Sequence, residues 1–114
     1  MPVLKLNEAK PIKVREGLTR RFVHGDSLML VVIDFDNGPW SQPEPWHFHT
    51  HEQATYVVEG EFIFFCEDEP DQKLSAGDMF WVISNKKHAI QLLSKTLKLV
   101  DSFSPVREDF LGRI

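Results

Sequence analysis

The chain has 114 residues, a length that fits a single domain. Its 13 basic and 17 acidic residues give a formal net charge of −4, which argues against a nucleic-acid partner because phosphate binding needs clustered positive charge. The single cysteine excludes an internal disulfide, and the longest apolar run, Leu28–Ile33, is far shorter than the roughly 20 residues that span a bilayer. We therefore expect a cytoplasmic, soluble domain without a nucleic-acid or membrane partner.

Runs rich in β-branched and aromatic residues follow one another along most of the chain, separated by turn residues. Leu28–Ile33 is the first clear run and ends at a turn cluster, Asp34–Pro39. Ala54–Val58 and Glu61–Cys66 lie on either side of a break that contains Gly60, a pattern typical of a β-hairpin.

The second half of the chain continues in the same way. An acidic loop over Glu67–Lys73 and a turn over Leu74–Asp78 precede three more predicted strands, Met79–Ile83, His88–Leu93 and Leu97–Phe103. No window of 11 residues has a convincing helical period of 3.6. Seven or eight short strands with frequent turns predict an all-β sandwich or small barrel.

A proline-rich stretch separates the first strand from the second. Its three prolines, Pro39, Pro43 and Pro45, lack the N–H groups that a central strand needs. We interpret this stretch as a stiff loop that brings the chain to Trp46. Such a loop either borders a site or is a plain connector, and the sequence favours neither.

Histidines gather directly after this loop. Residues two apart on an extended strand point to the same face, so His47 and His49 present two imidazoles side by side, which is how many metal sites begin. A His-x-His pair on its own is a weak motif, and most such pairs bind no metal.

The spacing of the wider constellation is more specific than the pair. The residues that carry it are, in chain order, His47, His49, Gln53, Gly60, Gly77, Asp78 and His88. They resemble the two sequence motifs of the cupin superfamily, and the resemblance extends over roughly residues 28–110. It implies an all-β, single-domain cupin fold (a double-stranded β-helix or jelly-roll barrel) with a core at about 28–103, an N-terminal strand or arm at 1–27 and a C-terminal tail at 104–114.

The same resemblance implies a metal centre held by His47, His49, Gln53 and His88. Gln53 stands where most cupins have Glu, so its amide oxygen brings no charge to the metal. At about 4 Å and an effective dielectric constant near 20, loss of that charge forfeits on the order of several kcal/mol of attraction. We expect weaker metal binding and a more favourable site for an anion. Zn, Ni, Fe and Mn all suit the donors.

Two other departures from the cupin motifs, and one competing candidate ligand, affect the interpretation of this metal centre. Ser84 and Lys86 replace the Pro and Gly that usually precede the third histidine, which leaves the shape of that turn open. His51 would share the face of His47 and His49 if the strand ran straight, but the cupin pattern places a turn at Thr50–Glu52. We therefore expect His51 to support the ligands or lie at the rim.

The C-terminal segment Val100–Leu111, together with residues 49–53, is similar to one group, the pectin-degradation cupins that linearise 4,5-unsaturated uronates. Thr50, Val106 and Phe110 depart from that group's pattern of Pro, Pro and Tyr. The resemblance implies that the remaining pocket residues are Asp101, Phe103 and Arg107.

Each of these three residues has a physical role in such a site. Asp101 lies two and four residues from Leu99 and Leu97, so it points to the same interior, where a carboxylate can act as general acid and base. Arg107 matches a uronate carboxylate with its planar fork, and Phe103 can cover the sugar ring. The alternative is that Asp101 and Arg107 simply pair with each other.

The leading hypothesis is a metal-dependent enzyme that opens unsaturated uronates to linear keto forms in sugar-acid catabolism. It uses one divalent transition metal and takes a small anionic substrate, with Asp101 and Arg107 as catalytic residues and Phe103, Arg107 and Trp46 as substrate contacts. Two alternatives stay open: a cupin dioxygenase or isomerase for another small oxygenated acid, and a non-enzymatic module that binds a small molecule. By resemblance the chain forms a homodimer through Pro2–Val14.

Overall fold

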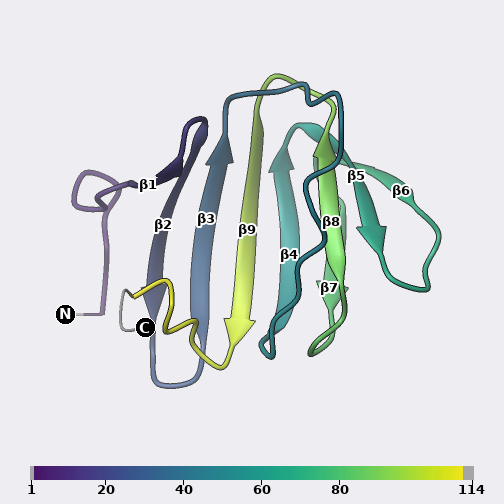
Figure 1. The fold of residues 1–114 in the computed structure, drawn as a ribbon. Helices are drawn as coiled ribbons and strands as arrows, with labels where there is room; N and C mark the ends of the chain where they lie inside the picture. The colour runs from purple at the N-terminus through teal and green to yellow at the C-terminus, as the bar shows by residue number, and fades with distance from the viewer. Residues whose placement is uncertain (1, 112–114) are drawn as a thin grey trace.

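Nine β-strands make up the regular structure of residues 2–111, the part of the chain that the computed structural model describes. They are β1 (Ile12–Arg15), β2 (Leu18–His24), β3 (Met29–Phe35), β4 (Glu52–Glu59), β5 (Glu61–Cys66), β6 (Gln72–Ser75), β7 (Met79–Val82), β8 (His88–Leu92) and β9 (Leu97–Ser104). All strand pairs are antiparallel, in a six-stranded sheet of order β1-β2-β3-β9-β4-β7 and a three-stranded sheet of order β6-β5-β8 (Figure 1). The predicted all-β class and cupin architecture are confirmed.

Several predicted boundaries were wrong. β3 continues through Asp34 and Phe35, which we had placed in a turn, because β3 pairs with β9 as far as Phe35↔Leu97. β6 forms within the stretch predicted as an acidic loop and a turn, where it pairs with β5. The total of seven or eight strands was therefore too low. In both places pairing with a distant strand decides the outcome, and local composition does not report it.

The predicted hairpin around Gly60 was also wrong. β4 pairs with β7 and β9, whereas β5 pairs with β6 and β8, so the two runs lie in different sheets. Gly60 has a φ of 99°, and a Cβ on it would lie 2.5 Å from the carbonyl oxygen of Thr96. Glycine is therefore required where the chain crosses from one sheet to the other.

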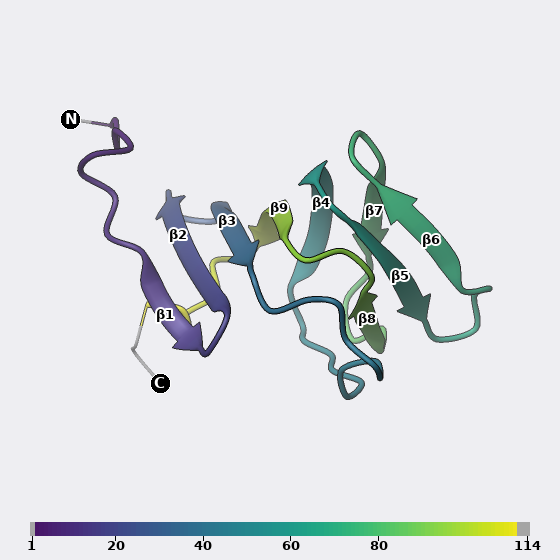
Figure 2. The ribbon, with the colours of Figure 1, turned by 90° about the horizontal axis from the view of Figure 1, so that it is seen from above.

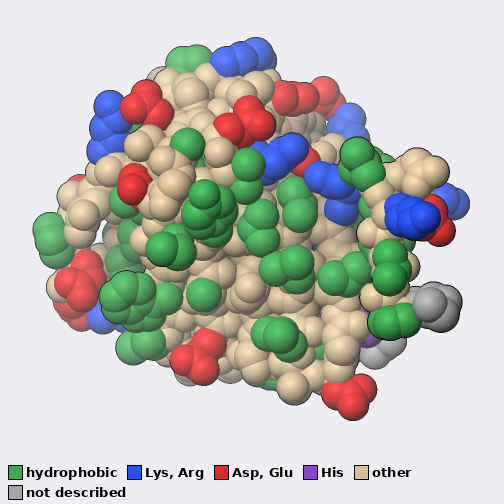
Figure 3. Space-filling view, turned by 180° about the vertical axis from the view of Figure 1, so that it is seen from behind, with side chains coloured by type: hydrophobic (Ala, Val, Ile, Leu, Met, Phe, Trp, Pro, Cys, Tyr) green, Lys and Arg blue, Asp and Glu red, His purple; other side chains and the backbone are tan. Residues whose placement is uncertain are grey.

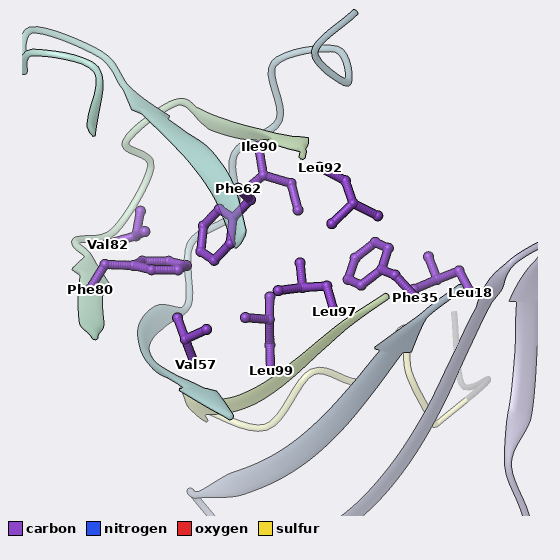
Figure 4. Packing of buried hydrophobic residues seen from close by; sticks show 10 residues of the cluster. All are labelled: Leu18, Phe35, Val57, Phe62, Phe80, Val82, Ile90, Leu92, Leu97 and Leu99. Carbon is purple, nitrogen blue, oxygen red and sulfur yellow. The ribbon is translucent and has the colours of Figure 1, made fainter. Parts of the chain in front are cut away.

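The main hydrophobic core fills the space between the sheets. Figure 4 shows its ten buried side chains, which come from both layers: Leu18, Phe35, Val57, Phe62, Phe80, Val82, Ile90, Leu92, Leu97 and Leu99. A second cluster of Met29, Val31, Phe103 and Val106 packs beside the C-terminal segment. On β9 the buried positions alternate through Leu97, Leu99, Asp101 and Phe103, so the strand places a carboxylate inside the barrel.

The proline-rich segment runs beside β8 instead of forming a strand of its own. Three of its backbone N–H groups donate to carbonyl oxygens of β8: Trp40 to Leu92, Glu44 to Ile90, and His47 to His88. Seen from above, the segment that follows β3 passes along β8, opposite the large sheet (Figure 2). The segment thus borders the strand that carries His88.

The rest of the chain extends the large sheet. β1 and β2 lie in the stretch expected to be an N-terminal strand or arm, and β2 pairs with β3 along its whole length. The ends of the expected arm and tail, Met1 and residues 112–114, lie outside the described residues. The outer face of this sheet carries many hydrophobic side chains (Figure 3), Tyr56, Met79 and Trp81 among them. Within residues 2–111 there is no helix long and apolar enough to cross a membrane.

Candidate metal centre and substrate site

Three of the four predicted ligands are histidines, and the fold brings them together. The ring centroid of His88 lies 4.3 Å from that of His47 and 5.1 Å from that of His49. The backbones of His47 and His88 exchange hydrogen bonds of 3.0 and 2.9 Å, so the end of the proline-rich segment is fixed to the start of β8. Imidazoles from two distant parts of the sequence therefore share one cluster.

The buried ring of His88 directs a lone pair into this cluster. Its Nδ1 faces the carbonyl oxygen of Lys86 at 2.9 Å, so Nδ1 carries the hydrogen. Burial lowers the pKa of His88 to about 4, which keeps the ring neutral near pH 7. Its Nε2 is buried and has no hydrogen-bond partner among residues 2–111. This is the arrangement of a metal-ligating histidine whose second nitrogen is held by a carbonyl.

His49 and Gln53 present two more lone pairs. Nδ1 of His49 donates to the carbonyl oxygen of His51 at 2.8 Å, which leaves Nε2 as an acceptor, and this atom faces Oε1 of Gln53 at 3.1 Å. Burial lowers the pKa of His49, which favours the neutral ring. Two acceptors at this distance repel each other unless a cation lies between them.

The orientation of the Gln53 amide follows from its other neighbours. Its Nε2 donates to Oγ1 of Thr55 at 3.0 Å and to Oδ1 of Asp101 at 3.4 Å. Reversing the amide would place its oxygen against the Asp101 carboxylate. The lone pairs of His49, Gln53 and His88 are therefore oriented by their surroundings, and a divalent cation with nitrogen and oxygen preference fits them.

His47 is engaged elsewhere in this structure. Its Nε2 bonds to Oε2 of Glu44 at 3.0 Å, and the same carboxylate oxygen accepts the N–H of Ile90 at 2.9 Å. Consistent with this, among residues 2–111 no three His, Cys, Asp or Glu side chains already surround a common metal position. Sequence reasoning missed Glu44, because nothing in a proline-rich loop marks one carboxylate as a histidine partner.

Asp101 lies behind Gln53, on β9. It is 3% exposed, and it accepts a 2.6 Å hydrogen bond from the hydroxyl of Thr55, which is equally buried. Burial raises its pKa to about 6, and the hydrogen bond from Thr55 opposes that rise. A carboxyl with this pKa both accepts and returns a proton near neutral pH. Thr55 was not predicted, although its position two residues after Gln53 on the same strand face could have indicated it.

Arg107 does not pair with Asp101, so that alternative is wrong. Arg107 binds Asp109 through two bonds, Nε to Oδ1 at 3.1 Å and Nη2 to Oδ2 at 2.8 Å. Its guanidinium carbon lies 5.1 Å from the ring centroid of Phe103, and that ring is 5.7 Å from His49. Phe103 and Arg107 thus continue from the imidazole cluster toward the C-terminal segment.

Two further residues considered from the sequence, His51 and Trp46, lie at the margin of the imidazole cluster. His51 is near the cluster, with its ring 5.7 Å from that of His49, and its carbonyl orients His49. Trp46 is 54% exposed. Within the described part of the chain, the ring contacts of the clustered histidines involve one another, His51 and Phe103, and do not include Trp46.

Comparison with known proteins agrees with this geometry. A family model for the cupin domain matches residues 32–103. The pectin degradation protein KdgF of Dickeya dadantii (strain 3937) is 35% identical over 98 residues, which cover 84% of this chain and 86% of that protein. The structure of KdgF from Halomonas sp. superposes with a TM-score of 0.81 at 32% identity, covering 93% of this chain and 96% of that one. An RmlC-like cupin from Shewanella frigidimarina NCIMB 400 superposes with a TM-score of 0.82 at 35% identity, covering 94% and 93%.

Proposed function

The chain belongs to the cupin family, and on that premise we propose that it opens 4,5-unsaturated uronate monosaccharides to their linear keto forms in sugar-acid catabolism. Similarity to a pectin degradation protein over most of both chains supports this substrate class. The observation that carries the proposal is the contact series Asp101–Thr55–Gln53–His49, in which hydrogen bonds join Asp101, Thr55 and Gln53, and Oε1 of Gln53 faces Nε2 of His49. It connects a carboxyl with a pKa of about 6 to the imidazole cluster.

One divalent transition metal (Zn, Ni, Fe or Mn) would be held by His47, His49, Gln53 and His88. When bound, such an ion supplies Lewis-acid polarisation of substrate oxygens. The neutral amide of Gln53 leaves more of the positive charge available to an anionic substrate. For His47 to join the other donors, its Nε2 has to leave the hydrogen bond to Glu44.

Asp101 moves the proton. Its carboxylate takes the proton of the anomeric hydroxyl, the bond from C1 to the ring oxygen breaks, and the electron pair of that bond goes to the ring oxygen. C1 becomes an aldehyde and the ring oxygen becomes the oxygen of an enolate at C5. Asp101 then returns the proton to C4, which leaves a ketone at C5. Substrate and product are isomers, so no oxidant is needed.

The remaining predicted residues bind and orient the substrate. Arg107 holds the uronate carboxylate through the donors that Asp109 does not use. Phe103 lies between Arg107 and His49 and covers the sugar ring. Trp46 contributes an exposed aromatic surface at the rim.

Loss of the enol absorbance of unsaturated galacturonate or mannuronate tests the proposal directly. We expect the metal-loaded protein to accelerate this loss, and D101N to lower kcat by at least 100-fold, since general acid–base groups contribute about 10²–10⁴-fold. Asp26 is exposed, and D26N is the matched control, with unchanged rate.

A second measurement separates metal binding from turnover. We expect elemental analysis of protein purified without chelator to find about one divalent ion per chain in the wild type and a clear loss in H88A. Absence of turnover by metal-loaded wild-type protein contradicts the proposed reaction, and equal metal content in H88A contradicts the proposed centre.

We also propose a cytoplasmic homodimer. β1 is an edge strand whose four residues are all exposed, and an unpaired strand edge is suited to pairing with a second copy. The buried free thiol of Cys66 agrees with a reducing compartment. Light scattering after gel filtration measures the oligomeric state, and a monomer mass at micromolar concentration contradicts the dimer.

A further inference from the structure

A second arginine lies at the C-terminal end of the site. Arg20 comes from β2, and its guanidinium carbon lies 3.7 Å from the ring centroid of Phe110. The guanidinium carbon of Arg107 lies 4.3 Å from the same ring centroid. Two guanidinium groups from opposite ends of the chain therefore share one aromatic ring.

This pair is continuous with the candidate site. The ring of Phe110 is 5.6 Å from that of Phe103, and Phe103 is 5.7 Å from His49. A row of rings thus leads from the imidazole cluster to the two arginines. Arg20 and Arg107 therefore lie at the end of this row that is farther from the histidines.

Within residues 2–111, the electrostatic neighbours of Arg20 are one carboxylate, Asp109, and one other cation, Arg107. Asp109 uses both of its oxygens on Arg107. The Nε of Arg20 is buried and has no hydrogen-bond partner in the described part of the chain. Burial lowers the pKa of Arg20, with Asp109 acting to raise it and Arg107 to lower it.

We propose that Arg20 is a second cationic residue of the substrate site, which binds the uronate carboxylate together with Arg107. The inference rests on the proposed function for its substrate class. Arg107 is already engaged along its Nε edge by Asp109, so it has fewer donors for a second carboxylate. Arg20 supplies a further positive charge and further donors, and it favours acidic sugars over neutral ones.

The neighbouring residue on the same strand provides a matched control. Successive side chains on a strand point to opposite faces, and Arg21 forms an ion pair with Asp34 at 3.7 Å. R20Q and R21Q therefore remove the same charge from the two faces of β2. R20K retains the positive charge without the planar fork.

Calorimetry with saturated galacturonate, which carries the carboxylate but lacks the reacting double bond, measures binding without turnover. Loss of a hydrogen bond to a charged group weakens binding about tenfold or more. We expect R20Q to raise the Kd for galacturonate by about tenfold, R20K to raise it less, and R21Q to leave it unchanged. With the unsaturated substrate, R20Q should raise KM by a similar factor and change kcat by less than about twofold.

The opposite result has a clear structural meaning. If Arg20 only anchors the C-terminal segment through Phe110, R20Q will lower the melting temperature and leave the Kd for galacturonate unchanged, which overturns the inference. A wild type that binds galacturonate through Arg20 but turns over no unsaturated uronate contradicts the proposed reaction and supports the inference. Normal turnover with an R20Q KM equal to wild type overturns the inference alone.

Discussion

Replacement of Thr55 by valine removes the link between the proton-carrying carboxyl and the amide of Gln53. Valine has nearly the shape of threonine, so the packing is retained while the hydroxyl is lost. That hydroxyl donates to Asp101 at 2.6 Å and accepts from Gln53 at 3.0 Å. Both Thr55 and Asp101 are 3% exposed, so water does not readily replace the lost partner.

The two hydrogen bonds set the expected cost of T55V. A bond to a charged group contributes about 1.5–3 kcal/mol and a neutral one about 1 kcal/mol. We therefore expect the free energy of unfolding to fall by about 3 kcal/mol at pH 8, where Asp101, with a pKa of about 6, is ionised. The loss is smaller than the ~5–15 kcal/mol that stabilises a typical domain, so the variant is expected to fold with reduced stability.

Catalysis should respond as well as stability. Without Thr55 the amide of Gln53 and the carboxylate of Asp101 lose their common orientation, so we expect kcat to fall at least tenfold with a much smaller change in KM. T55S restores the hydroxyl and should recover most of both effects. Thr96 is exposed, and T96V is the matched control, expected within about 0.5 kcal/mol of wild type.

Urea unfolding and initial rates measure the two effects. A T55V unfolding free energy within about 0.5 kcal/mol of wild type would refute the argument that these hydrogen bonds stabilise the site. A T55S variant as impaired as T55V would show that the lost hydroxyl is not the cause.

Two further substitutions test the framework of the site. G60A should destabilise the chain by more than G77A, because both positions have a positive φ but only the Cβ at Gly60 meets a neighbouring carbonyl oxygen; equal urea midpoints for the two variants would contradict the crowded crossing. E44A should lower the free energy of unfolding by about 2 kcal/mol, since it leaves the N–H of Ile90 without its acceptor and releases His47, whereas E44Q retains an acceptor and should cost less. Wild-type stability of E44A would mean that Glu44 does not tie the proline-rich segment to β8.

The local pattern of the sequence was sufficient for the all-β class and for the inward direction of β9. Alternation of apolar residues along Leu97–Phe103 has a period of two, and that period alone places Asp101 on the buried face. The cluster of His47, His49 and His88 followed from motif spacing, since that spacing is characteristic of a known family.

The sheet to which each strand belongs was decided by tertiary structure. Gly60 indicates a turn, but a turn that forms a hairpin and a turn that crosses between sheets have the same local sequence signal. The choice depends on whether β5 gains more by pairing with β4 or with β6 and β8. The paired residues lie 8–14 positions away on β6 and 22–30 positions away on β8. Strand pairing is a long-range interaction, so local propensity does not determine it.

The sequence also did not predict which groups the charged residues contact. Arg107 binds Asp109, Glu44 binds His47, and Arg20 stacks on Phe110. The residues that carry the chemistry could be recognised from short sequence motifs, because each motif lies within one strand or turn. Arg20 and Phe110 lie 90 residues apart in sequence, so only folding brings them together. Arg107–Asp109 and Glu44–His47 are local pairs, but composition does not show which nearby group each charged side chain binds.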